Sequence, residues 1–365
     1  MPFRPLNPDK DMQLNTDNQS FGMAAFSLPG RSARMLFKGS ISGLTDNTIL
    51  KEGKPGFVMA PFGKELPVLW LEAEDIQEIT HLSRSDLIAG AESPSGIQGQ
   101  RIHQADRDEY LTQVAHIRDL INAGQAGKVV LSRQILIPAT GAHKPAALFN
   151  MLCDLYPDAF VYLAAFPGYG TWAGATPETL IRFRESSIRT MALAGTRDVQ
   201  SGAEWSAKEH DEHAIVSRYI VDHLQQQGCT GITATSPYTV KAGRLEHLRT
   251  DITALSNIQQ MPSVVNALHP TPAVCGLPTL NAEAMIRQTE KHDRTYYTGY
   301  LGPVWAGEIS LFVNLRCMQM INDGVLVYVG GGLTALSDPA AEWEETRLKS
   351  TTLLPVIEKM QNLAD

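Results

Sequence analysis

Short apolar runs bounded by Gly and Pro recur along most of the chain. They occupy 57–60 and 68–71 in a first hundred residues rich in Gly, Pro, Ser and Asn. Later runs occupy 128–137, 159–166, 178–183, 188–194, 297–305, 311–320 and 325–329. Runs of this length and composition predict β-strands separated by turns.

Helical periodicity appears in fewer places. Apolar residues recur at helical spacing across 106–123, at Tyr110, Val114, Ile117 and Ile121, and predict a helix that follows a polar surface loop. Further helices are predicted over 203–227, around 285–290 and over 340–363. The strands cluster instead of alternating with helices, so we predict an α+β fold with a largely antiparallel sheet and helices outside it.

Composition narrows the class of protein. With 365 residues, 43% of them apolar and 19% charged, the chain has the proportions of a globular protein. No apolar run approaches bilayer length and the start lacks a signal-peptide pattern, so a cytoplasmic protein without a membrane partner is expected. The net charge of −8 argues against nucleic acid as a partner. The four widely spaced cysteines suggest buried, reduced thiols.

Two acidic pairs stand out on the predicted helices. Glu209 and Glu212 are three residues apart, as are Glu342 and Glu345, so each pair shares one helical face. Such a face is often solvated or neutralised by neighbouring basic residues, and Lys349 stands four residues after Glu345. The recurrence of the pair on two distant helices, one of them just after three glycines, favours an oxygen-ligand site for Mg²⁺.

Histidines beside the first acidic pair suggest a transition-metal site as an alternative. His210 and His213 are three residues apart, whereas the zinc protease helix spaces its histidines by four, and neither helix has the Glu-x-x-His of a di-iron bundle. Both histidines are therefore expected to be partly exposed helix residues.

Lys128 begins an apolar strand. A lysine at this position is usually a solvent-facing strand end. The functional alternative is an ammonium drawn into a site, where desolvation lets it lose a proton and act as a general base. These residues alone leave both interpretations open.

An ordered set of short motifs resembles those of the chorismate-binding enzymes. The motifs are KVVLSR at 128–133, GATPE at 174–178, AGTR at 194–197, EHDEH at 209–213, HPTPA at 269–273, DR at 293–294, LRC at 315–317, GGG at 330–332 and EWEET at 342–346. The resemblance implies one chorismate-binding domain over 1–365. Residues 106–365 would be its catalytic core and 1–105 an abbreviated N-terminal part of the scaffold.

Two positions sort the members of this family by nucleophile. The family comprises isochorismate, salicylate, anthranilate and aminodeoxychorismate synthases. Members that use water carry a lysine at the position of Lys128, where anthranilate synthases typically carry glutamine. Aminodeoxychorismate synthases carry a nucleophilic lysine where this chain has Ala194. Both positions imply water as the nucleophile.

The resemblance also implies a role for each candidate residue. Lys128 would deprotonate the water that attacks C2, and Glu178 would protonate the departing C4 hydroxyl. Glu212 and Glu345 would be the main Mg²⁺ ligands, with Glu209 and Glu342 completing the acidic shell. The remaining residues would bind substrate: Gly195, Thr196, His247, Tyr297, Arg316, Gly330, Gly332 and Lys349.

The predicted function is therefore that of an isochorismate synthase, a Mg²⁺-dependent isomerase acting on chorismate. A salicylate synthase, which shares Lys128 and Glu178 but eliminates pyruvate, is the nearest alternative, and an ammonia-using anthranilate synthase-like subunit is a more distant one. No glutaminase partner is expected, and a monomer is expected with a dimer as the alternative. The pathway, menaquinone or siderophore biosynthesis, stays open.

Overall fold

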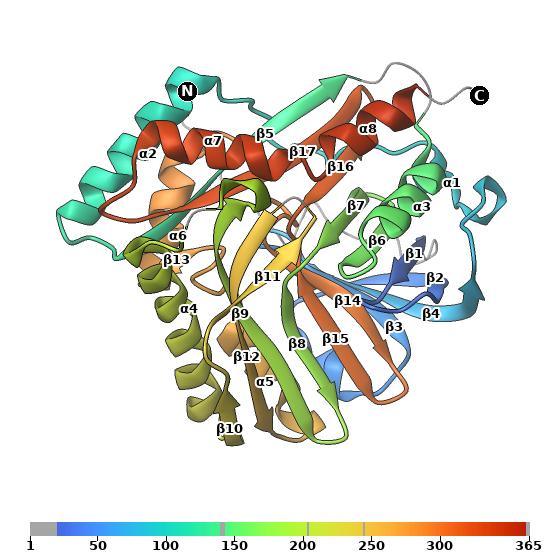
Figure 1. Cartoon of the computed structure of the whole chain (residues 1–365). Coiled ribbons are helices and arrows are strands. Elements are labelled where there is room, and N and C mark those ends of the chain that lie inside the picture. Colours follow the sequence, from blue (N-terminus) through green and yellow to red (C-terminus); the bar gives the residue numbers. More distant parts are fainter. Residues whose placement is uncertain (1–19, 139–142, 203, 244, 363–365) are drawn as a thin grey trace, which may run out of the picture.

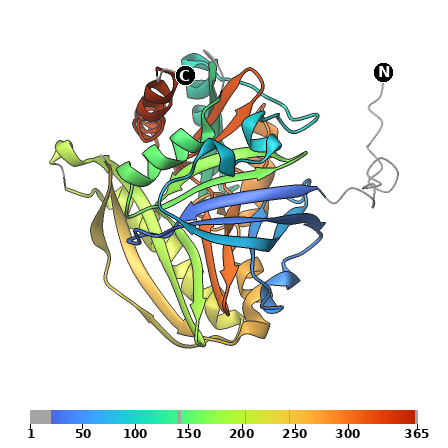
Figure 2. The same ribbon diagram turned by 90° about the vertical axis from the view of Figure 1, so that its right-hand side faces the viewer.

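Antiparallel β-strands form the framework of the protein, as predicted from their clustering in the sequence (Figures 1 and 2). The computed structural model describes residues 20–138, 143–202, 204–243 and 245–362. Every strand pairing in this part of the chain is antiparallel. The α+β prediction is confirmed.

The strands pair into one continuous, folded sheet. Their spatial order is β13, β5, β17, β16, β7, β6, β1, β2, β4, β3, β14, β15, β8, β9 and β12, after which both β10 and β11 pair with β12. The N-terminal strands β1 to β4 thus join the half of the sheet that contains β5 to the half that contains β9.

The strand bounds fit the predicted runs closely in several places, although β1, β2, β7 and β10 to β13 were not predicted. The strands are β1 (Phe21–Ser27), β2 (Arg34–Leu44), β3 (Gly56–Ala60), β4 (Val68–Ile79), β5 (Lys128–Pro138), β6 (Phe160–Phe166), β7 (Gly170–Thr176), β8 (Thr179–Arg184), β9 (Ser187–Asp198), β10 (Thr230–Ala234), β11 (Tyr238–Ala242), β12 (Leu245–Leu255), β13 (Gly276–Leu277), β14 (Tyr300–Trp305), β15 (Glu308–Val313), β16 (Cys317–Ile321) and β17 (Gly324–Leu333).

Helices cover the outside of the folded sheet (Figure 1). Helix α7 packs on α2 and β17, α4 packs on β9 and β12, and α3 packs on β6 and α8. None of the described helices has both the length and the apolar character needed to cross a bilayer. The helices are α1 (Ala89–Glu92), α2 (Arg107–Asn122), α3 (Pro145–Leu155), α4 (Ala207–Gln226), α5 (Met261–Leu268), α6 (Thr279–Thr289), α7 (Pro339–Ser350) and α8 (Leu354–Gln361).

Helix α4 shows how the apolar pattern fixes this packing. Val216, Ile220 and Leu224 are buried and follow one another at intervals of four residues, so they form one stripe against the sheet. The start of α2 is stabilised by a local hydrogen bond: the Asp106 carboxylate accepts from the Glu109 amide at 2.9 Å and so caps the helix. The four cysteines are free thiols and all are buried, as expected.

Three predictions need correction. The predicted strand 311–320 is two strands, β15 and β16, because the chain turns at Arg316, whose φ is +47°. The predicted helix 340–363 is two helices, since Pro355 cannot continue a preceding helix and instead lies in the first turn of α8. His213 is not partly exposed but buried, with Nε2 2.8 Å from the Thr250 hydroxyl. Ala203 and Leu363, at the predicted helix ends, lie outside the described residues.

Candidate active site

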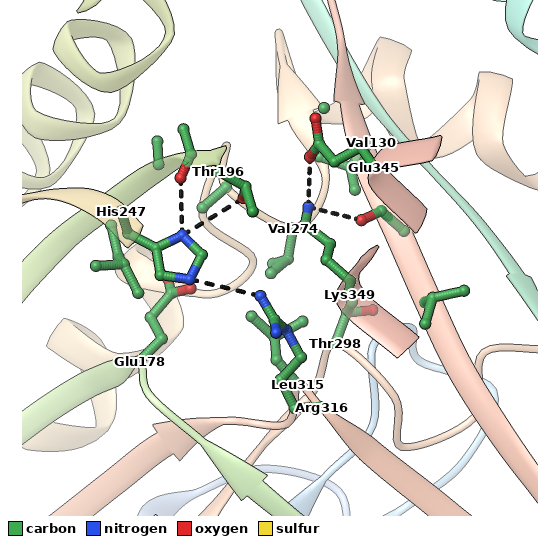
Figure 3. A pocket seen from close by; sticks show the side chains of 18 of the residues that line it. Val130, Glu178, Thr196, His247, Val274, Thr298, Leu315, Arg316, Glu345 and Lys349 are labelled. Carbon is green, nitrogen blue, oxygen red and sulfur yellow. Dashed lines mark hydrogen bonds and ion pairs between the residues drawn. The ribbon is translucent and has the colours of Figure 1, made fainter. Parts of the chain in front are cut away.

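A cavity lies between the two halves of the folded sheet, where β5 and β17 face β9 and β12 (Figure 3). It contains about 730 Å³ of space between protein atoms, including its open mouth. Every residue predicted for catalysis or substrate binding lines it, together with Glu212 and Glu345. Glu209 and Glu342 are not among its lining residues.

Lys128 is buried at the start of β5 and does not face solvent. Its side chain is 1% exposed, and its Nζ lies 2.8 Å from Glu212 Oε1 on α4. Gly332 of β17 runs beside this ion pair, so closely that a Cβ at that position would lie 2.5 Å from Glu212 Oε1 and 2.9 Å from Lys128 Cε. Any side chain at this position would have to displace the ends of Lys128 and Glu212, so glycine leaves the room that the pair occupies.

A second lysine–glutamate pair enters the cavity from α7. Lys349 Nζ lies 2.7 Å from Glu345 Oε1, four residues earlier on the helix, and donates a hydrogen bond of 2.8 Å to the Gly330 carbonyl (Figure 3). This is the i, i+4 helix ion pair that the sequence left open as the alternative to metal binding. Lys349 thus holds α7 against the glycine segment of β17.

Glu178 lies between β7 and β8 and is buried, with its residue 4% exposed. Burial raises the pKa of its carboxyl from 4.5 to about 8, although Lys128 and Lys349 oppose the shift. The carboxyl therefore carries its proton at neutral pH, which is the form that the predicted general acid requires.

A β-bulge positions His247 in the wall formed by β9 and β12. Glu246 pairs with Arg197 and Leu248 pairs with Ala194, so Gly195 and Thr196 together oppose the single residue His247. Gly195 has a φ of +73°, the left-handed conformation that a bulge of this kind assigns to glycine.

The hydrogen bonds of His247 fix its tautomer. Its Nδ1 lies 2.8 Å from the Gly195 carbonyl and must be the donor, which leaves Nε2 as the acceptor facing an Arg316 nitrogen at 3.5 Å (Figure 3). Burial, together with the Arg316 charge, lowers the pKa of His247 to about 3. A neutral histidine thus borders the Arg316 guanidinium.

Arg316 is a partly buried cation with no carboxylate within ion-pair distance among the described residues, although the charge of Glu345 acts on it from further away. Its Nη1 donates to the Thr352 hydroxyl at 2.9 Å, and burial lowers its pKa to about 10. The guanidinium thus remains charged at neutral pH. A buried charge without an ionic partner is unfavourable on its own, so this part of the cavity favours an anionic ligand.

The acidic residues fit a hard cation only in part. Glu212 and Glu345 reach the cavity, whereas the Glu209 carboxylate accepts hydrogen bonds from the Ser206 amide at 2.7 Å and hydroxyl at 2.5 Å, and so caps α4. As the side chains stand in the described part of the chain, no three acidic, His or Cys residues gather tightly enough to hold a metal. Two carboxylates do match Mg²⁺, which usually keeps several waters and binds one or two carboxylates plus substrate.

The structure adds contributors that the sequence analysis did not identify. Thr352 binds the Arg316 guanidinium, and Pro177, Leu193, Thr298 and Tyr328 line the cavity. An apolar or hydroxyl residue in a run of similar residues carries no sequence signal for such a role. The positive φ of Thr298, +60°, is likewise visible only in the folded chain.

Known proteins similar to this chain indicate its family. Isochorismate synthase EntC of Escherichia coli is 30% identical over 257 residues, which cover 67% of this chain and 65% of EntC. A salicylate biosynthesis isochorismate synthase of Pseudomonas aeruginosa is 33% identical over 273 residues, or 71% of this chain and 56% of that protein. The chain thus spans less than two thirds of the length of either relative.

A solved structure and a family model complete the comparison. MenF, the menaquinone-specific isochorismate synthase from Escherichia coli, superimposes with a TM-score of 0.76 at 22% identity, over 93% of this chain and 89% of MenF. This likeness shows a shared fold. The model of the chorismate binding enzyme family matches residues 59–358. The chain therefore belongs to the chorismate-binding enzyme family.

Proposed function

We propose that the protein converts chorismate to isochorismate. The observation that carries this proposal is the presence in one cavity of a buried lysine, Lys128, and a buried carboxyl, Glu178, whose pKa of about 8 keeps it protonated. Water addition and hydroxide loss are both slow without proton transfer, and these two groups supply a base and an acid. The relatives named as isochorismate synthases support the same reaction.

The reaction balances without a redox partner. Lys128 must first lose the proton that it carries in its ion pair with Glu212, and water then adds at C2 of the ring while its proton passes to the neutral amine. The two ring double bonds shift, and the C4 hydroxyl leaves as water with a proton from Glu178. Arg316 and Tyr297 bind the enolpyruvyl carboxylate, because a guanidinium matches a carboxylate and Arg316 has no ionic partner of its own. His247 borders the guanidinium through its unprotonated Nε2.

Mg²⁺ is part of the proposal. Glu212 and Glu345 would hold it, and it would supply a positive charge for the ring carboxylate of the substrate. In the described structure Lys128 and Lys349 neutralise these same carboxylates.

Product analysis tests the reaction directly. Purified protein is incubated with chorismate and Mg²⁺ in H₂¹⁸O, and products are separated by chromatography and weighed by mass spectrometry. We expect isochorismate with one ¹⁸O atom, and loss of turnover in Lys128→Ala. Salicylate with pyruvate would instead identify a salicylate synthase, and an aminated product that needs ammonium would identify an ammonia-using enzyme.

Metal binding is tested without reference to turnover. Isothermal titration with Mg²⁺ is compared between the unmodified protein, Glu345→Gln and the control Glu344→Gln, whose carboxylate is 61% exposed beside Arg347. We expect weakened binding in Glu345→Gln alone. Equal titrations in all three proteins would remove Glu345 from the metal site.

A further inference from the structure

A second charged groove lies away from the active site, on the solvent face of the sheet at β8, β9 and β15. Its lining includes Arg31 from the turn between β1 and β2, Arg182 and Arg184 from β8, and Arg189 from β9. None of these residues lines the catalytic cavity. The proposed function gives this groove no role.

The strand register makes the arginine arrangement unfavourable. Arg182 and Arg189 are directly opposite each other on β8 and β9, so their side chains leave the sheet on the same face. Like charges at directly opposed positions destabilise an antiparallel pair. Arg182 is also half-buried, and burial lowers its pKa; the charge of Glu308 opposes this shift, and the repulsion of Arg189, Arg31 and Arg184 adds to it.

Neighbouring glutamates neutralise this cluster only in part, because Glu308 attracts Arg182 but forms its ion pair with Arg184. Glu185 and Glu308 both pair with Arg184, at 3.3 and 3.2 Å from its Nε. Glu78 also borders the groove. Arg31, Arg182 and Arg189 have no carboxylate within ion-pair distance among the described residues. Three arginines without a carboxylate at ion-pair distance thus line one groove of a chain whose net charge is −8.

We propose that this groove binds a small anion carrying two or more negative charges, a phosphate ester or a polycarboxylate. Planar guanidinium forks match phosphate and carboxylate oxygens bidentately, and an anion between Arg182 and Arg189 replaces their repulsion with two attractions. Trp305 also lines the groove; it is 43% exposed, and its ring packs edge-on against Phe37.

Thermal unfolding and calorimetry test the site with two probes, inorganic phosphate and citrate. The control for each probe is NaCl at the same ionic strength. The unmodified protein is compared with Arg182→Gln/Arg189→Gln and with a control of equal charge change, Arg107→Gln/Arg218→Gln. We expect a saturable rise of Tm with at least one probe in the unmodified and control proteins. Affinity should fall about tenfold or more in the Arg182/Arg189 variant.

The two probes separate the sources of the anion. Tighter phosphate binding identifies a phosphate ester, and tighter citrate binding a polycarboxylate. An equal Tm rise in all three proteins, or no rise beyond that of NaCl with either probe, overturns the proposal.

A single substitution keeps the test valid if the double variant folds poorly. Arg189→Gln removes an exposed side chain, so it should fold, and without added anion it should raise Tm by about 1–2 °C at low salt because the repulsion is relieved. Chorismate turnover should be unchanged, since Arg189 is outside the catalytic cavity. An unchanged phosphate and citrate affinity in Arg189→Gln also contradicts the proposal.

Discussion

Two clusters of buried polar groups lie along β5, and they differ in how their charges are satisfied. Four residues after Lys128, the Ser132 amide and hydroxyl donate to Glu290 Oε1 at 2.7 and 2.9 Å. Arg294 donates to both Glu290 oxygens, at 2.6 and 2.9 Å, and to the Val130 carbonyl at 2.6 Å. This cluster is closed, because its carboxylate and its guanidinium pair with each other.

The catalytic cavity is the open counterpart. Arg294 is buried and Arg316 is partly buried, yet the carboxylate partner Glu290 helps to raise the pKa of Arg294, whereas desolvation lowers that of Arg316. The contrast teaches that burial of an arginine does not by itself indicate function. A buried arginine without an internal carboxylate indicates a place for an external anion.

The largest expected effect is a loss of catalytic rate on substitution of a residue in the open catalytic cavity. Glu178→Gln removes the proton donor of the cavity and should lower kcat about 10²- to 10⁴-fold, the usual contribution of general acid catalysis. Steady-state kinetics with chorismate, checked by circular dichroism for folding, measures this. Glu185→Gln, at an exposed turn, serves as the control and should keep full activity. Comparable kcat in Glu178→Gln would exclude Glu178 as the acid.

The closed cluster should matter chiefly for stability. Glu290→Gln leaves Arg294 buried without its ionic partner and should lower the free energy of unfolding by about 3–5 kcal/mol. Arg316→Met removes a charge that has no such partner, so its free energy of unfolding should be unchanged or higher. Urea denaturation of both variants compares them, and equal losses would contradict the distinction between closed and open clusters.

The raised pKa of Glu178 predicts a pH dependence with a definite sign. The folded protein holds this proton up to about pH 8, whereas the unfolded chain releases it near pH 4.5. The raised pKa of Glu178 therefore contributes to the free energy of unfolding. This contribution is fully present below about pH 4.5 and is lost as pH rises through about 8. Urea denaturation between pH 5 and 9 should show a decline that is reduced in Glu178→Gln.

Activity should follow the same proton. Above pH 8 the protonated fraction of Glu178, and with it kcat/KM, should fall about tenfold for each further pH unit. A kcat/KM profile that stays flat from pH 7 to 10 would show that another group donates the proton.

The smallest expected effect concerns the support of Arg316. Thr352→Val removes the hydroxyl that accepts from the guanidinium at 2.9 Å and should raise KM about fivefold, the equivalent of about 1 kcal/mol for one hydrogen bond. The adjacent variant Thr351→Val loses a hydroxyl that bonds the Leu348 carbonyl instead, and should leave KM unchanged. Equal KM values in the two variants would show that Arg316 does not need this contact.

Local patterns predicted much of the fold. The periodic apolar residues of 106–123 correspond to α2, and the apolar run from Lys128 corresponds to β5. Both elements could be predicted because the apolar pattern of neighbouring residues is enough to indicate a helix with one buried face or a buried strand. The break between α7 and α8 was missed, although Pro355 marks it in the sequence. The turn at Arg316 was also missed, because arginine gives no local indication of a positive φ.

The candidate site was predicted residue by residue from its resemblance to a family, and the cavity brings those residues together except Glu209 and Glu342. The roles of Lys128 as base and of the glutamates as metal ligands stay predictions. The contribution of Thr352 was missed, since a threonine beside other threonines is indistinguishable in sequence from its neighbours.

The sequence by itself determined which chemical groups this protein has and the local elements that carry them: a lysine beginning a strand, glutamates three apart on helices and an arginine between two apolar residues. Only the tertiary structure decided what each group faces. Lys128 meets Glu212, Arg294 meets Glu290 and Arg316 meets no carboxylate in the described chain. The reason is that burial and the distance to other charges set the energy of an ionised group, and the pairing of distant strands and helices fixes both.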